Sequence, residues 1–176
     1  MFISNRASVC YSDAMEDIFD TVVVRAAGIP AGHPLAGVLS GRSNIIELTE
    51  KSHDAALKPE PTGGLTHSER AALACRMALL NLDDELASHY QSMVEEADAL
   101  IADPNFDGGD NARLKAIIRH TGLVTCSPKD AAAGDIAALK AAGIGEEDIV
   151  RLSELIAFVN YQVRLAAGLR VMVEAS

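Results

Sequence analysis

Four side chains that could do chemistry lie between residues 69 and 90, in the segment ERAALACRMALLNLDDELASHY. They are Glu69, Cys75, Arg76 and His89. A cysteine thiolate can attack a peroxide, and a histidine, with its ordinary pKa close to neutrality, can move protons. An arginine does not lose its charge, so a buried one must bind a carboxylate, a carbonyl or a ligand. This segment is therefore the candidate catalytic segment, with Glu69 as a further acid.

Each of these side chains also has a structural interpretation. Arg76 could form an ion pair with Glu69, Asp83 or a carboxylate of another element instead of binding an anion. The apolar surroundings of Cys75 would raise the pKa of its thiol and favour inert packing. His89 is expected on the flank of a helix, where histidines are often core-edge or surface residues. The sequence leaves both interpretations open.

The composition indicates which fold must position these residues. Hydrophobic residues make up 49% of the 176 residues, aromatic residues only 4%, and there is no Trp. The core must therefore consist of Ala, Leu, Ile and Val, a mixture that favours close-packed helices. A chain of this length is one ordinary domain, and we expect an all-α fold.

Charge and cysteine content exclude several classes of function. The formal net charge of -10 would repel phosphate backbones, so we expect no nucleic-acid partner. No run approaches the ~18 apolar residues of a membrane span, and the N-terminus lacks the apolar core of a secretion signal. Cys10, Cys75 and Cys126 are far apart and form no C-x-x-C arrangement. We therefore expect a soluble, cytoplasmic protein with no disulfide framework, no metal and no cofactor.

The chain divides at KPEPTGG, residues 58–64. Residues 1–64 contain many Gly and Pro breaks and predict a short helical arm, whereas residues 65–176 predict a compact helical core. Within the core, Thr66 and Glu69 form a capping-box pattern before a helix that is apolar on every side. The other predicted helices cover residues 12–27, a stretch of roughly ten residues after Ser43 or Asn44, 86–103, 111–121, 127–143, and 146 onward.

The last predicted helix, which begins near Glu146, has apolar residues over more than one stripe. A single small domain cannot easily bury so wide an apolar face. Part of this helix should therefore lie in an interface between subunits, and we expect a homo-oligomer assembled through it.

The end of the chain resembles the carboxymuconolactone decarboxylase and alkylhydroperoxidase-D-like superfamily. Its residues are similar to the F-x-N-x-x-N-R-L-A-x-G-L-x-V ending of that superfamily, with Val163 where a second Asn is usual. Residues 114–150 are similar to the preceding helix and loop of peroxidase-related members, and AGIPAGHPLAGV in the arm resembles a thiol-poor subgroup. The matching residues of the ending are Phe158, Asn160, Arg164, Leu165, Ala166, Gly168, Leu169 and Val171.

The resemblance implies the compact helical fold of this superfamily over residues 65–173, but its peroxidase motif is incomplete here. Peroxidase members carry E-x11-C-x2-C-x3-H, in which one thiolate attacks the peroxide and a second thiol resolves the sulfenic acid. With a one-residue insertion, Glu69 and His89 match the acid and the histidine, but neither cysteine has a counterpart. Without insertion, the motif falls on Ala71, Asp83, Leu86 and Tyr90, or on Arg70, Leu82, Glu85 and His89.

We therefore expect a protein of this superfamily that is not a functional dithiol peroxidase. Three hypotheses follow. In the first, Cys75 alone reacts with peroxides, assisted by His89, as in an antioxidant enzyme. In the second, a thiol-independent lyase or decarboxylase binds a small carboxylic acid through Arg76 and moves a proton with His89. In the third, the protein is a non-catalytic oligomeric binding protein that keeps only the scaffold.

Overall fold

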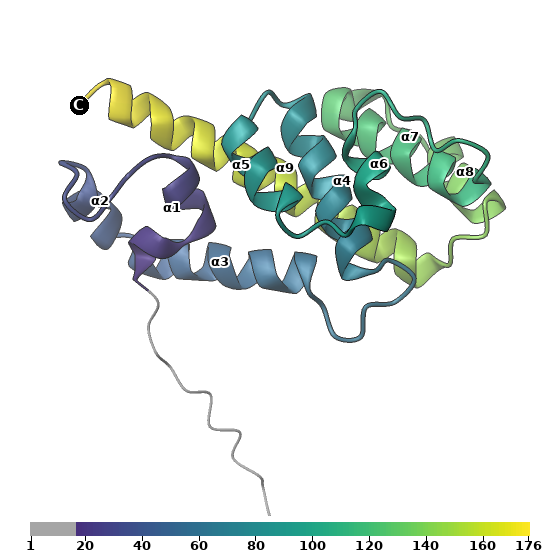
Figure 1. Ribbon diagram of the computed structural model, residues 1–176, viewed down its shortest axis with the longest axis horizontal. Coiled ribbons are helices and arrows are strands. Elements are labelled where there is room, and N and C mark those ends of the chain that lie inside the picture. The colour runs from purple at the N-terminus through teal and green to yellow at the C-terminus, as the bar shows by residue number, and fades with distance from the viewer. Residues whose placement is uncertain (1–16) are drawn as a thin grey trace, which may run out of the picture.

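The computed structural model describes residues 17–176, and in that range it contains helices and no strand, which confirms the all-α class (Figure 1). The predicted helix start at Asp13 and Glu16, like Cys10, lies outside the described residues. The longer helices are α3 (Ser43–Leu57), α4 (His67–Leu80), α5 (Asp84–Gln91), α7 (Ala112–Cys126), α8 (Ala133–Ala141) and α9 (Glu146–Glu174). The shorter elements are η1 (Ile18–Asp20), α1 (Val22–Ala26), α2 (Ala36–Ser40), η2 (Glu96–Asp98), α6 (Ala99–Ala102) and η3 (Pro128–Asp130).

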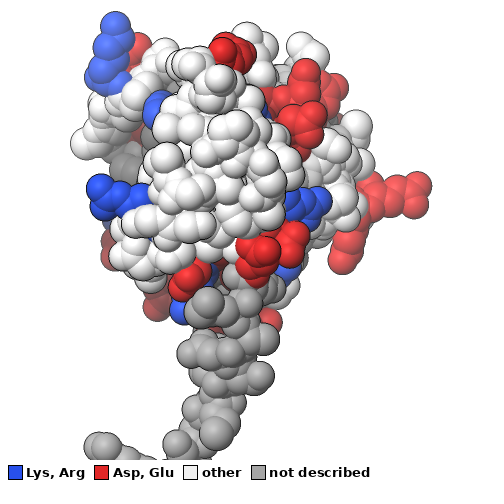
Figure 2. Space-filling model, turned by 90° about the vertical axis from the view of Figure 1, so that its left-hand side faces the viewer, with Lys and Arg blue, Asp and Glu red and all other residues white. Residues whose placement is uncertain are grey.

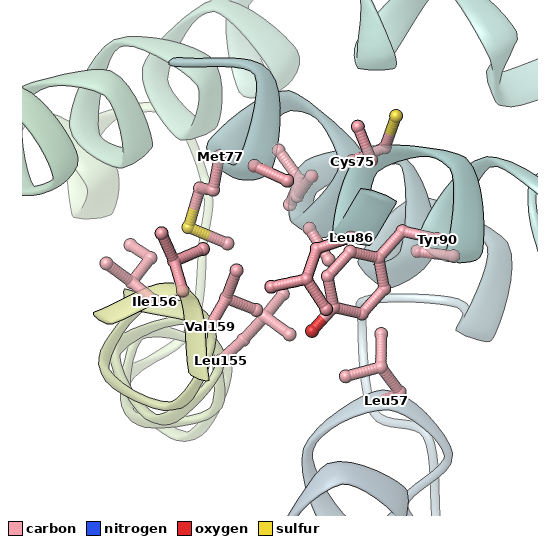
Figure 3. Packing of buried hydrophobic residues seen from close by; sticks show 14 of the residues in the cluster. Leu57, Cys75, Met77, Leu86, Tyr90, Leu155, Ile156 and Val159 are labelled. Carbon is pink, nitrogen blue, oxygen red and sulfur yellow. The ribbon is translucent and has the colours of Figure 1, made fainter. Parts of the chain in front are cut away.

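Helix α4 lies at the centre of the molecule, as its all-round apolar sequence predicts (Figure 1). Thr66 accepts a hydrogen bond from the Glu69 amide, and the Glu69 carboxylate accepts one from the Thr66 amide, so the predicted capping box is present. Helices α3, α5, α6, α7 and α9 all pack on α4. Figure 3 shows Met77 of α4 facing Ile156 and Val159 of α9 in this core.

The predicted helix over residues 86–103 is wrong. Helix α5 ends at Gln91, and the chain turns before η2 and α6. The Ser68 hydroxyl accepts a hydrogen bond from the Glu95 amide, which ties the turn to α4. A tertiary contact of this kind overrides the helical periodicity of the segment.

Two further boundaries also differ from the predictions. Helix α7 continues through Gly122 to Cys126, because packing against the core outweighs the cost of about 1 kcal/mol for a glycine inside a helix. The predicted helix over 127–143 is split into η3 and α8, with an extended residue, Ala131, after η3. The Asp135 carboxylate accepts the Ala132 amide and begins α8 there.

Helix α9 is 29 residues long and has three acidic residues in its first turn, where the helix dipole favours them. Of its apolar residues, Leu152, Leu155 and Ile156 are buried inside this chain. Others, such as Val150, are exposed. No helix within residues 17–176 is long and apolar enough to cross a membrane.

The end of the molecule formed by α2 and the C-terminal turns of α9 is largely uncharged (Figure 2). Lys, Arg, Asp and Glu side chains lie around the rim of this end rather than across its centre. Exposed Val38, Val171 and Met172 belong to these elements. The acidic excess of the chain is therefore distributed unevenly over the surface.

Candidate functional site

A pair of histidines joins α3 to α5. The Nε2 atoms of His53 and His89 lie 3.1 Å apart, within hydrogen-bonding distance. His53 is only 2% exposed, whereas His89 is partly exposed. The rings of Tyr90 and Phe158 both lie 6.1 Å from the His53 ring and enclose it. The pair is thus a buried imidazole in contact with a more accessible one.

A carboxylate sets the tautomers of this pair. Nδ1 of His53 lies 3.3 Å from Oδ1 of Asp54. Since an ionised carboxylate only accepts hydrogen bonds, Nδ1 of His53 carries a proton and its Nε2 is an acceptor. Nε2 of His89 must then donate to Nε2 of His53, which leaves Nδ1 of His89 with a free lone pair. The order Asp54, His53, His89 therefore makes Nδ1 of His89 the basic nitrogen of the pair.

Both histidines are uncharged at neutral pH. Burial lowers the pKa of His53, although Asp54 opposes the effect. Burial, followed by the charges of His53, Arg25 and Lys58, lowers the pKa of His89 to about 4. A hydrogen bond between two neutral imidazoles needs one donor and one acceptor, which this protonation state supplies.

His89 lines a cavity of about 330 Å³ between α1 and α5. Arg25 lies on the α1 wall, and Glu85, Ser88 and Ser92 lie on the α5 wall with His89. The cavity therefore contains a cation, hydroxyl groups and a basic imidazole. A small anion with hydrogen-bonding groups has the matching chemistry.

Tyr90 supports the pair from the core side. It is fully buried, and its hydroxyl donates a short hydrogen bond to the side-chain oxygen of Gln162 on α9. Burial raises the pKa of Tyr90, so the phenol stays neutral. Its ring is nearly parallel to that of His53, at 14°. Figure 3 shows Tyr90 between Leu86 and Leu57, deep in the apolar packing.

Cys75 is buried and belongs to a different contact. Its Sγ lies 3.5 Å from the side-chain oxygen of Gln91. Burial raises the pKa of the Cys75 thiol, as the sequence predicts for an apolar setting. Within residues 17–176, no hydrogen bond joins Cys75 to His89. The structure therefore supplies no partner that would stabilise a Cys75 thiolate.

Arg76 binds main-chain carbonyls, so the ion pairs predicted for it are wrong. Its guanidinium donates to the carbonyl oxygens of Ile101, Asp103 and Pro104, at 3.3, 2.5 and 2.9 Å. These carbonyls lie at the end of α6 and in the loop that follows, where helical hydrogen bonds stop. Arg76 therefore caps α6, and its Nε is buried without a partner in the described chain.

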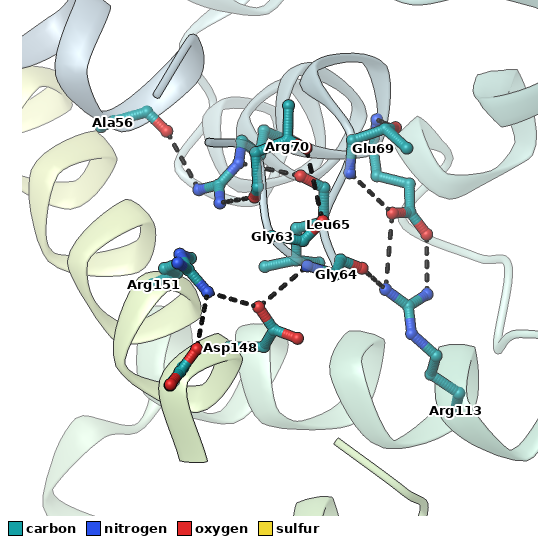
Figure 4. A network of polar contacts seen from close by, with 12 residues as sticks. Ala56, Gly63, Gly64, Leu65, Glu69, Arg70, Arg113, Asp148 and Arg151 are labelled. Atoms are coloured by element: carbon teal, nitrogen blue, oxygen red, sulfur yellow. Dashed lines mark hydrogen bonds and ion pairs between the residues drawn. The ribbon is translucent and has the colours of Figure 1, made fainter. Parts of the chain in front are cut away.

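The two carboxylates predicted as partners of Arg76 bind other arginines. Asp83 accepts both guanidinium nitrogens of Arg170, at 2.9 and 2.8 Å. Glu69 forms an ion pair with Arg113 at 2.7 Å (Figure 4). Glu69, Cys75, Arg76 and His89 are thus held separately. No hydrogen bond or ion pair among residues 17–176 joins any two of these four side chains.

Glu69 belongs to a polar network that holds the linker between arm and core (Figure 4). Arg113 also donates to the carbonyl oxygen of Gly64, and the Gly64 amide donates to Asp148 at 2.9 Å. Buried Arg70 donates to the carbonyl oxygens of Leu65, Ala56 and Thr62. Two arginines of the predicted catalytic helix, Arg70 and Arg76, therefore serve to fix loops. The division of the chain at residues 58–64 stays a prediction.

His53, Asp54 and Arg25 are missing from the site predicted from sequence. His53 lies on the buried side of α3 with Ile46, Thr49 and Leu57, at intervals of three and four residues. This periodicity was the available signal for a histidine that faces the core. Nothing in the sequence indicates that His53 meets His89, because the two are 36 residues apart.

No family model matches the chain, and the comparisons with curated proteins and with solved structures likewise find no match. The relation to the superfamily named above therefore rests on the sequence resemblance. Of the four predicted residues, only His89 lies at the cavity, where the structure adds His53, Asp54 and Arg25.

Proposed function

We propose that this protein is a thiol-independent acid–base enzyme of the carboxymuconolactone decarboxylase and alkylhydroperoxidase-like type. It acts as a lyase or decarboxylase on a small carboxylic acid and is not a dithiol peroxidase. The observation that carries the proposal is the Asp54, His53 and His89 series, which ends at a polar cavity. A series of this kind orients a general base and stabilises the cation that forms when the base takes a proton.

In this proposal the substrate carboxylate binds Arg25 on the α1 wall. Arg25 replaces Arg76 in the role that the sequence predicts for Arg76, because the Arg76 guanidinium holds carbonyls. Ser88 and Ser92 line the same cavity and supply hydroxyl groups for other polar atoms of the substrate. The volume of about 330 Å³ suits a molecule of a few carbon atoms.

Substrate binding also makes His89 a stronger base. Without substrate, the Arg25 charge contributes to the low pKa of His89. A carboxylate bound to Arg25 neutralises that charge and adds a negative one, so the pKa of His89 rises toward neutrality. His89 then accepts a proton through Nδ1, while its Nε2 keeps the hydrogen bond to His53. The base is thus activated when the acid is in place.

The peroxidase alternative has weaker support. It requires a Cys75 thiolate, and burial raises the pKa of that thiol. A resolving thiol would also be needed for a dithiol cycle. Among the described cysteines, Cys126 is exposed, whereas Cys75 is buried. We also propose a cytoplasmic location, in keeping with two free thiols, and a homo-oligomer assembled through α9.

The proposal is tested with a panel of small mono- and dicarboxylic acids in two assays. In thermal denaturation, an acid that binds the folded state raises the melting temperature. The Arg25→Ala variant should lose this shift, and Arg42→Ala, another exposed arginine, should keep it. In deuterated water, NMR should detect deuterium incorporation into the acid or loss of carbon dioxide by the parent protein, and neither by His89→Gln.

The outcomes separate the proposal from its alternatives. Stabilisation that depends on Arg25, with chemistry that depends on His89, supports an acid–base enzyme. Stabilisation without any chemistry supports a binding protein and contradicts catalysis. If no acid stabilises the parent protein, the proposed carboxylate site is wrong.

A further inference from the structure

The outer face of α9 carries a row of exposed residues at alternating spacings of four and three. On a helix of 3.6 residues per turn, this spacing places all of them along one line, as in a coiled-coil seam. The row spans about 27 Å, calculated from the helical rise of 1.5 Å per residue. Its members are Val150, Glu154, Ala157, Tyr161, Arg164 and Gly168, and we call them the α9 row.

The α9 row is complementary to itself in the reverse direction. If a second copy of α9 runs antiparallel, with a two-fold axis at residue 159, Glu154 of one copy faces Arg164 of the other. The small Ala157 then faces the large Tyr161, and Val150 faces Gly168. Opposite charges and opposite sizes are thus matched at every position, which is the requirement for an isologous interface.

The two charged residues of the α9 row have no partner of opposite charge within residues 17–176. Glu154 makes no ion pair there, and Arg164 donates only to the carbonyl oxygen of Asn160, at 2.7 Å. Both side chains are exposed. Each therefore has capacity for a partner from outside the chain.

Helix α3 widens this face with apolar residues. The hydroxyl groups of Thr49 and Tyr161 lie 3.0 Å apart, which places α3 beside the centre of the α9 row. Ile45 and Leu48 of α3 are 44% and 56% exposed. Tyr161 itself is 44% exposed. Apolar surface of this kind on an otherwise acidic protein is typical of a contact between subunits.

We propose that two copies of this protein form a dimer by packing their α9 rows antiparallel, with two Glu154–Arg164 ion pairs between the copies. The balanced charges let the copies associate although each has a formal net charge of -10. The inference specifies the proposed assembly through α9 and is independent of the acid–base chemistry, so either can fail without the other.

The test is a charge swap measured by sedimentation velocity over a range of concentrations at low ionic strength. Glu154→Arg places two cations opposite each other twice in the dimer, and Arg164→Glu does the same with anions. Each single variant should weaken dimerisation by about tenfold or more. The double variant, Glu154→Arg with Arg164→Glu, should restore the parent affinity to within about threefold, because both pairs reform in reverse.

A matched control makes the same change of net charge elsewhere. Glu96→Arg alters an exposed acid on η2 and should leave the dimer intact. Circular dichroism establishes that every variant keeps its helices. The proposal is overturned if the parent protein is monomeric at all concentrations, if the single swaps leave an oligomer unchanged, or if the double swap fails to restore assembly.

Discussion

The His53–His89 pair predicts a specific loss of stability at acidic pH. The folded state holds His89 neutral with a pKa of about 4, whereas an unfolded histidine has a pKa of 6.5. The unfolded chain therefore binds more protons as the pH falls below 6.5, and the free energy of unfolding decreases. At pH 7.5 both states are neutral at this residue, so the penalty is absent there.

The magnitude follows from these two pKa values. Between pH 7.5 and pH 5.0, proton binding at His89 lowers the free energy of unfolding by ~2 kcal/mol. Burial lowers the pKa of His53 as well, so its contribution has the same sign. The His89→Gln variant lacks the titrating group, and its amide can still donate to Nε2 of His53.

The assay is urea denaturation of the parent and His89→Gln at pH 7.5 and pH 5.0. The difference between the two proteins at pH 7.5 reports lost contacts, and only its change with pH reports the proton. We expect the parent to lose ~2 kcal/mol more than the variant between these pH values. Equal losses would refute the claim that the folded protein suppresses protonation of His89.

Three further predictions concern residues outside the cavity. Arg70→Met should lower the free energy of unfolding by about 2–4 kcal/mol in urea denaturation, because the Leu65, Ala56 and Thr62 carbonyls lose their donors; a change below about 1 kcal/mol would contradict this. Gly64→Ala should cost about 1–2 kcal/mol in the same assay, since a Cβ there would collide with the Asp148 carboxylate, and an unchanged stability would contradict the contact. With a dithiol reductant, Cys75→Ser should consume hydroperoxide no more slowly than the parent; a loss of turnover would establish a one-cysteine peroxidase.

Local sequence signals were enough to predict the central helix. The capping box of Thr66 and Glu69 depends on residues three apart, and the all-round apolar sequence of α4 requires a buried position. The break after α5 could not be predicted in this way, because it depends on Ser68, which is 27 residues from Glu95. Elements fixed by local chemistry were thus predictable, and those fixed by distant contacts were not.

The candidate site shows the same division. His89 was predicted because its residue type suits proton transfer, and its place at a cavity is consistent with that prediction. Arg70 and Arg76 lie in one buried helix, and only the fold shows that distant carbonyls bind both of them. His53 was missed because its function depends on a neighbour from another helix. A residue type indicates what a side chain can do, and the tertiary contacts decide whether it is free to do it.

The central claim is that Asp54 and His53 leave Nδ1 of His89 as a free base. NMR of the histidine ring nitrogens at pH 7 measures this directly, because protonated and unprotonated nitrogens have different shifts. We expect a proton on Nδ1 of His53, a proton on Nε2 of His89, and no charge on either ring. A proton on Nδ1 of His89, or a charged ring at pH 7, would contradict the proposed base.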